Sequence, residues 1–106
     1  MTDWTKLRED LAAAREAAEL AAQGDDGGSS NFDDVRLFGV RWSKRAAGVA
    51  EEAGLRARRA TWLRRACISL ELPGTGQGHT RTRAAEALAR VLRGRGWDAS
   101  VFYMAD

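Results

Sequence analysis

The fold is decided by residues 66–104, ACISLELPGTGQGHTRTRAAEALARVLRGRGWDASVFYM. Residues 66–72 alternate between apolar and small or polar side chains, which is the period of a half-buried strand. Pro73 then ends the strand, because it has no N–H group to donate. Residues 84–92 place apolar side chains at helical spacing, and residues 99–104 alternate again. This order of strand, loop, helix and strand predicts a crossover unit with parallel strands.

The residues before this unit predict its other half. Residues 35–40 alternate as a first strand, and Ser43 is placed to cap a helix. Residues 56–63 alternate as a second strand, joined to the next one by a tight turn at Arg64 and Arg65. The sequence therefore predicts an α+β domain with a ferredoxin-like βαββαβ sheet and two helices on one face.

An extra helix is predicted in front of this sheet. Residues 1–23 carry apolar side chains at spacings of three and four, so they form an amphipathic helix that packs on the domain or pairs with a second copy in a homodimer. Residues 24–32 are rich in Gly, Asp and Ser and predict a flexible linker, and residues 33–106 form the α+β domain. The aspartates of the linker lack the spacing of a calcium loop, so no metal site is predicted.

The composition excludes several classes of protein. The chain has 106 residues, enough for one domain with a single modest core. A single cysteine excludes an internal disulfide. The chain also has only one histidine, so it has too few cysteine and histidine ligands for a structural zinc site. No apolar run approaches the roughly 18 residues of a membrane span, and the N-terminus lacks the pattern of a signal peptide. We expect a cytoplasmic protein without membrane contact.

The net charge of +2 hides a division along the chain. Residues 1–34 hold nine acidic and three basic side chains, whereas residues 35–106 hold fourteen basic and six acidic ones. A basic segment at residues 35–106 that follows an acidic segment at residues 1–34 favours an anionic partner, of which nucleic acid is the commonest. A well-solvated surface, screened by the acidic segment, is the alternative explanation.

A helical interpretation of the arginine-rich stretch gives a different fold. If residues 56–63 form a helix after residues 49–55, the pair resembles a helix-turn-helix with Arg56, Arg58 and Arg59 at the start of the recognition helix. The turn lacks the usual polar capping residue. A DNA-binding transcriptional regulator is therefore the alternative function.

The most site-like stretch is the glycine-rich loop after the strand at residues 66–72. Glycines let backbone N–H groups approach an anion, and Thr80 or Thr82 is the predicted N-cap of the next helix. The loop lacks the Lys-Ser/Thr ending of a nucleotide-binding P-loop and the full dinucleotide fingerprint, so it is either an anion site or only a turn. The predicted partner- or anion-binding residues of this loop and of the arginine-rich strand and turn are Gly76, Gln77, Gly78, His79, Arg81, Arg83, Arg58 and Arg64. We expect loss of Arg81 and Arg83 to weaken binding without lowering the melting temperature.

The sequence offers little for catalysis. His79 has no nucleophile or carboxylate near it in sequence, and Cys67 lies in mid-strand. We therefore predict a non-enzymatic protein without a cofactor. Phe38, Trp62 and Phe102 fall on the outer face of the predicted sheet, where they either stack nucleic-acid bases or form a protein interface.

Three segments carry a resemblance. Residues 25–33 (DDGGSSNFD), 76–78 (GQG) and 98–103 (DASVFY) resemble segments of small uncharacterised phage and prophage proteins. The resemblance implies a phage-encoded inhibitor of bacterial defence, as anti-CRISPR proteins are, that binds a protein or nucleoprotein complex without chemistry. It assigns no role to any residue.

Overall fold

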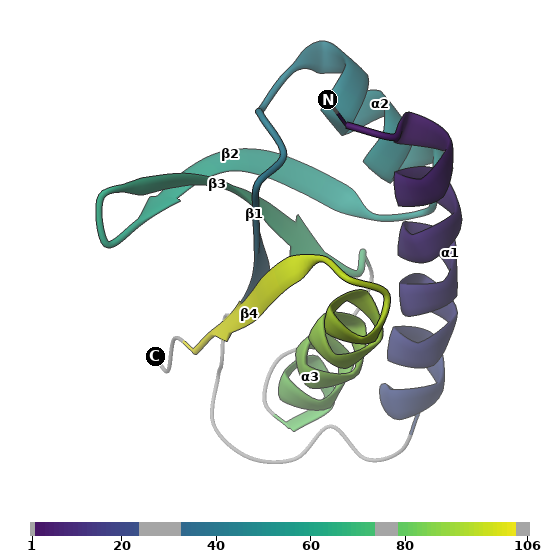
Figure 1. The fold of residues 1–106 in the computed structure, drawn as a ribbon. Helices are drawn as coiled ribbons and strands as arrows, with labels where there is room; N and C mark the ends of the chain where they lie inside the picture. Colours follow the sequence, from purple (N-terminus) through teal and green to yellow (C-terminus); the bar gives the residue numbers. More distant parts are fainter. Residues whose placement is uncertain (1, 24–32, 74–78, 104–106) are drawn as a thin grey trace.

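The computed structural model of the chain describes residues 2–23, 33–73 and 79–103. These residues form three helices and four strands, in an α+β arrangement (Figure 1). Their order along the chain is α1 (Trp4–Ala21), β1 (Asp34–Phe38), α2 (Lys44–Glu52), β2 (Arg56–Trp62), β3 (Arg65–Glu71), α3 (His79–Gly94) and β4 (Asp98–Phe102). The predicted linker at residues 24–32 lies outside the described residues.

The four strands make one antiparallel sheet in the order β2-β3-β1-β4. β1 pairs with both β3 and β4, so these two strands run parallel to each other with β1 between them. Likewise β1 and β2 run parallel with β3 between them. Because residues 56–62 form β2, the recognition helix of a helix-turn-helix is absent, and that interpretation of the segment is wrong.

All three helices lie on one side of the sheet, and α1 runs along α3 and also touches α2 (Figure 1). Alternate residues of β1 and β3 face these helices, as the sequence alternation predicts. α1 packs on its own domain and shares its core. The largest fully buried side chains come from helices and strands alike and are Leu7, Leu11, Leu37, Leu55, Leu70, Leu88, Leu92 and Val35. None of the described helices is long and apolar enough to cross a membrane.

The helix ends follow local chemistry. The side chain of Asp3 accepts a hydrogen bond from the Lys6 backbone N–H at 3.0 Å, and that of Ser43 accepts one from Ala46, so both act as N-caps. α3 begins at His79, so Thr80 and Thr82 lie inside its first turn. The prediction that one of these threonines caps the helix is therefore wrong.

The hairpin turn is shifted by one residue from its predicted place. β2 ends at Trp62 and β3 starts at Arg65, so Leu63 and Arg64 form the turn. Both take left-handed backbone angles, with φ of 52° and 66°. This matches the two-residue hairpin turns that need positive φ at both central positions. The local sequence has neither Gly nor Asn, which explains why the turn could not be placed by its residues alone.

The hairpin extends beyond the rest of the sheet. β3 pairs with β2 from Arg65 to Glu71, but it pairs with β1 only from Ile68 to Leu70. The first half of β3 and the facing half of β2 therefore have no further strand beside them. This overhang forms the projection at the left of Figure 1.

Candidate functional site

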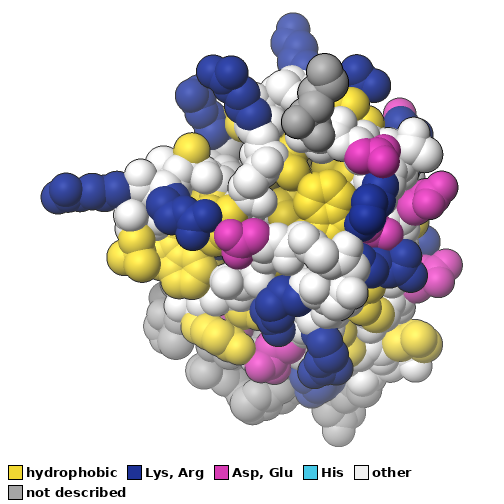
Figure 2. Space-filling view, viewed as in Figure 1, with side chains coloured by type: hydrophobic (Ala, Val, Ile, Leu, Met, Phe, Trp, Pro, Cys, Tyr) yellow, Lys and Arg dark blue, Asp and Glu magenta, His cyan; other side chains and the backbone are white. Residues whose placement is uncertain are grey.

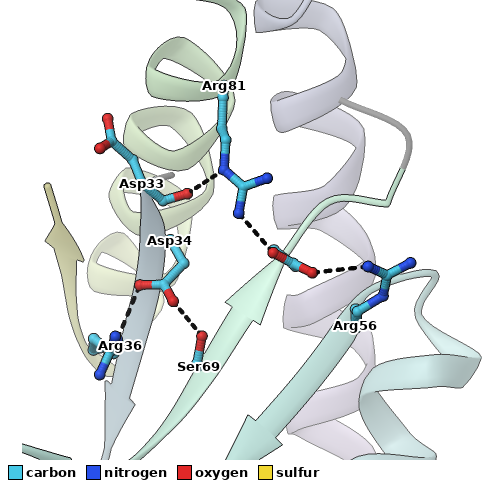
Figure 3. A network of polar contacts seen from close by, with 7 residues as sticks. Asp33, Asp34, Arg36, Arg56, Ser69 and Arg81 are labelled. Atoms are coloured by element: carbon cyan, nitrogen blue, oxygen red, sulfur yellow. Dashed lines mark hydrogen bonds and ion pairs between the residues drawn. The ribbon is translucent and has the colours of Figure 1, made fainter. Parts of the chain in front are cut away.

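Arg81, a predicted anion ligand, is engaged inside the protein (Figure 3). Its Nε donates to the backbone oxygen of Asp33 at 2.9 Å, and its Nη2 donates to Glu71 Oε2 at 2.6 Å. Glu71 Oε1 in turn accepts from Arg56 Nη1 at 3.0 Å. The side chains of Arg81 and Glu71 are mostly buried. Arg81 therefore joins the start of α3 to β3 and to the residue before β1.

Burial by itself raises the pKa of Glu71. Hydrogen bonds from Arg81 and Arg56, and the charges of Arg81 and Arg58, outweigh that cost and hold the pKa below its ordinary value. Glu71 is thus an anion whose charge is neutralised within the fold.

A second carboxylate lies next to this group. Asp34 accepts hydrogen bonds from Ser69 Oγ and from Arg36 Nε, the latter at 2.9 Å (Figure 3). Thr82 Oγ1 donates to the Asp33 carboxylate at 2.6 Å. The cavity between these groups and α3 measures only about 10 Å³, so it is no larger than a single water molecule. The described residues of this network therefore leave no room for a ligand between them.

Arg83, the other predicted clamp, holds the end of α1. Its Nε donates to the carbonyl oxygen of Ala21 at 2.9 Å, and its Nη2 lies 3.4 Å from the carbonyl oxygen of Gln23. His79 is the first residue of α3. The remaining predicted loop residues, Gly76, Gln77 and Gly78, lie outside the described residues. Both arginines of the predicted loop site thus contact the protein itself, and the anion site at the loop stays a prediction.

A polar cluster that the sequence did not reveal surrounds Asp10 in α1. Its carboxylate accepts hydrogen bonds from Lys6 Nζ at 2.5 Å, Arg95 Nη1 at 2.9 Å and Trp97 Nε1 at 2.8 Å. Burial raises the pKa of Asp10, but these donors outweigh burial and lower its pKa from 3.8 to about 2. The cluster ties α1 to the end of α3. No local pattern predicts it, because Asp10 and Trp97 are 87 residues apart.

The aromatic side chains of the outer sheet face contact one another. The ring of Trp62 lies 6.1 Å from that of Phe38, nearly parallel to it, and 5.4 Å from that of Phe102, edge to face. The guanidinium of Arg36 lies over Phe102, and that of Arg65 lies over Phe38. These rings contact one another and two guanidiniums, while Trp62 and Phe102 remain half-buried, so base stacking and a protein interface at this face both stay predictions.

The remaining arginines of this region have no such partners. Arg41, Arg58, Arg59 and Arg64 are exposed, and in the described part of the chain none of their side chains forms a hydrogen bond, an ion pair or a cation–π contact, although the charge of Arg58 acts on Glu71. Three belong to the β2–β3 hairpin and one to the loop that leaves β1. Figure 2 shows basic side chains projecting on the side where the hairpin lies in Figure 1. Of the predicted site residues, Arg58 lies in the middle of β2 and Arg64 in the hairpin turn.

The tip of the hairpin carries an exposed apolar side chain. Leu63 is 84% exposed, the most exposed of the large hydrophobic side chains in the described residues, and it precedes Arg64 in the left-handed turn. Leu63 was not among the candidate residues predicted from the sequence. No local signal in the sequence marks Leu63, because the turn contains neither Gly nor Asn.

An open groove lies between the hairpin and the loop after β1. Its volume is about 500 Å³, and it is lined by Gly39, Val40, Arg41, Trp42, Arg59, Ala66 and Cys67. Arg41, Trp42 and Arg59 line this groove and were not among the site residues predicted from the sequence. Within the described residues no three His, Cys, Asp or Glu side chains gather as metal ligands.

Comparison of the chain with protein-family models, with curated proteins and with solved structures finds no match. The assignment of a functional surface therefore rests on the geometry and charge of the residues themselves.

Proposed function

We propose that this chain is a non-enzymatic binding protein that contacts an anionic protein or nucleoprotein partner through the β2–β3 hairpin. One observation carries the proposal. In the described residues, the arginines of this domain divide into those engaged within the fold, such as Arg36, Arg81 and Arg83, and five exposed ones without a hydrogen bond, an ion pair or a cation–π contact. Four of these five lie in the hairpin and the adjacent loop, and the fifth, Arg90, lies in α3.

The hairpin tip supports a contact role beyond charge. An edge strand rich in charge resists edge-to-edge aggregation, and that role needs no apolar residue at the tip. Leu63, however, is held outward in a left-handed turn that costs L-residues about 1–2 kcal/mol each. Backbone strain of this kind concentrates at functional sites. An exposed apolar side chain beside arginine suits the core of a protein interface.

The proposal also includes a more specific fold for the domain that carries the hairpin. The order β2-β3-β1-β4, with two helices crossing between parallel strands, supports a ferredoxin-like βαββαβ domain with α1 added in front. The resemblance of three segments to phage and prophage proteins supports a cytoplasmic inhibitor of bacterial defence, such as an anti-CRISPR protein. The loop residues Gly76, Gln77, Gly78 and His79, and formation of a homodimer, stay predictions.

A binding assay with two polyanions tests the proposal. Duplex DNA and polyglutamate serve as labelled probes in anisotropy titrations over a range of salt concentrations. We expect binding that weakens with salt, and the variant Arg58→Gln/Arg64→Gln should bind about ten-fold more weakly. The control, Arg8→Gln/Arg90→Gln, removes the same formal charge from the exposed faces of α1 and α3, where Arg8 pairs with Glu52, and should change affinity by less than about two-fold.

Two results would contradict the proposal. Absence of binding to both probes at low salt would remove the anionic partner. Equal losses in the hairpin and control variants would show that net charge alone, and not the hairpin, carries the affinity.

A further inference from the structure

We infer that the groove between the β1–α2 loop and the hairpin binds a nucleotide of single-stranded nucleic acid, with the base against Trp42 and the flanking phosphates at Arg41 and Arg59. The inference deepens the proposed function and rests on it, since it names the chemistry of the anionic partner.

The groove follows from the mismatch in strand lengths. β1 ends at Phe38 and the chain turns away at Gly39, which has a φ of +85°, whereas the hairpin continues past this point. The helix-facing side of the overhang is therefore uncovered, and Arg59 and Ala66 on that side are exposed. The resulting space of about 500 Å³ lies within the range of roughly 300–1,000 Å³ found for small-ligand sites.

The charge of the groove selects an anion. Arg41 and Arg59 both line it, are exposed, and form no ion pair within the described chain. The groove has no acidic residue among its lining residues. Guanidinium groups recognise phosphate by paired hydrogen bonds as well as by charge. Two free guanidiniums beside one groove therefore suit two phosphates of one backbone.

The aromatic wall selects a planar group. Trp42 is half-buried and packs against the hydrophobic core, so its indole is held in place while part of it faces the groove. Stacking on a fixed aromatic ring is the usual way in which proteins hold unpaired bases. A duplex keeps its bases paired and offers only phosphates to such a groove. An acidic peptide offers anions but no flat ring, so single-stranded nucleic acid matches both features.

The test compares four probes on the full chain. They are a labelled oligothymidylate of about 12 nucleotides, a duplex of the same length, thymidine monophosphate and polyglutamate. We expect the single strand to bind most tightly. Trp42→Ala should weaken single-strand binding about ten-fold and leave duplex binding unchanged, whereas Trp42→Phe should keep most of the affinity. Arg41→Gln/Arg59→Gln should lower the slope of log affinity against log salt by about 1.4.

Arg8→Gln/Arg90→Gln again serves as the control of equal charge. Trp42→Ala removes contacts with the core and could therefore unfold the protein. In that case Trp42→Phe, which keeps an aromatic ring, and Arg41→Gln/Arg59→Gln, whose side chains are exposed, still test the inference. Single-strand affinity that is unchanged in Trp42→Ala, or in the Arg41/Arg59 variant, would overturn the inference. So would duplex, monophosphate or polyglutamate binding as tight as that of the single strand. If either of these results is found but Arg58→Gln/Arg64→Gln still weakens polyanion binding, the proposed function stands and only the assignment of the groove fails.

Discussion

The guanidinium of Arg83 in α3 donates a hydrogen bond to the carbonyl oxygen of Ala21, the last residue of α1, across 62 positions of sequence. The last carbonyls of a helix have no partner within the helix, and a positive charge near them is favourable. The last turn of α1 contains no basic residue of its own. Arg83 therefore supplies from α3 the cap that α1 lacks, and it fixes where α1 ends on the domain.

Replacement of this cap should lower stability. We expect Arg83→Ala to reduce the free energy of unfolding by about 1–2 kcal/mol, because charged hydrogen bonds to the end of α1 are lost. Urea denaturation followed by circular dichroism measures it. Arg90→Ala, in an exposed position on the same helix, should change stability by less than about 0.5 kcal/mol. Equal stability of the two variants would show that Arg83 does not hold α1.

The ion pair of Arg81 with Glu71 leads to a second prediction. Arg81→Ala leaves a mostly buried Glu71 carboxylate with only Arg56 donating to it, and we expect a loss of about 2 kcal/mol. A double-mutant cycle with Glu71→Gln, read by urea denaturation, should give a coupling energy of about 1 kcal/mol. Additive losses would contradict the pairing. These contacts replace the expectation from sequence that Arg81 and Arg83 can be removed without a change in melting temperature.

The periodic parts of the fold could be predicted because their signals are local. The alternation at residues 66–72 places Ile68 and Leu70 against the helices, and Ser43 caps α2 as its side chain allows. The second strand was also predicted, since alternate residues of the arginine-rich stretch face opposite sides of the sheet.

The functions of individual arginines could not be predicted because they depend on distant partners. Arg81 and Arg83 sit next to a glycine-rich loop, where an arginine is as well placed for a phosphate as for the protein itself. Only the folded chain brings Glu71 and the end of α1 to them. The groove at Trp42 likewise depends on how far β3 extends past β1, which is a property of register between strands and not of either strand's sequence.

The Asp10 cluster makes stability depend on pH in acid. Its pKa of about 2 in the folded protein lies below the ordinary 3.8, so its contribution is complete above about pH 4 and is lost as the pH falls toward 2. Its side chain is only 6% exposed, but Lys6 and Arg95 are half-exposed, so screening by solvent limits the contribution to about 1–2 kcal/mol.

We expect urea midpoints measured between about pH 6 and pH 2.5 to fall less steeply in Asp10→Asn than in the unmodified chain. Glu9→Gln removes an exposed carboxylate one position away and serves as the control. Identical pH dependence of Asp10→Asn and the unmodified chain would contradict a role for Asp10 in acid stability.

The aromatic contacts of the outer face predict that substitution of Trp62 lowers stability strongly, whereas substitution of the next residue, Leu63, leaves stability nearly unchanged. Trp62→Ala removes the ring that lies between Phe38 and Phe102, and we expect a loss of about 2 kcal/mol because the ring is half-buried. Leu63→Ala, at the next residue and in the turn itself, should change stability by less than about 0.5 kcal/mol, since that side chain is exposed. Thermal denaturation measures both. A loss in Leu63→Ala equal to that in Trp62→Ala would mean that the tip packs on the domain.

The strained turn predicts that stability and binding respond in opposite directions. Leu63→Asn/Arg64→Gly places in the turn the residue pair that accepts positive φ at both positions, so we expect a gain of about 1 kcal/mol in the free energy of unfolding. The same change removes the apolar tip and one free arginine, and polyanion binding should weaken. Arg58→Gln, in β2, should weaken polyanion binding without the gain in the free energy of unfolding. A less stable Asn-Gly variant would show that Leu63 and Arg64 hold the turn through contacts of their own. A variant that is more stable but binds as before would instead show that the turn's conformation serves no contact, and the hairpin tip would then have to be excluded from the proposed surface.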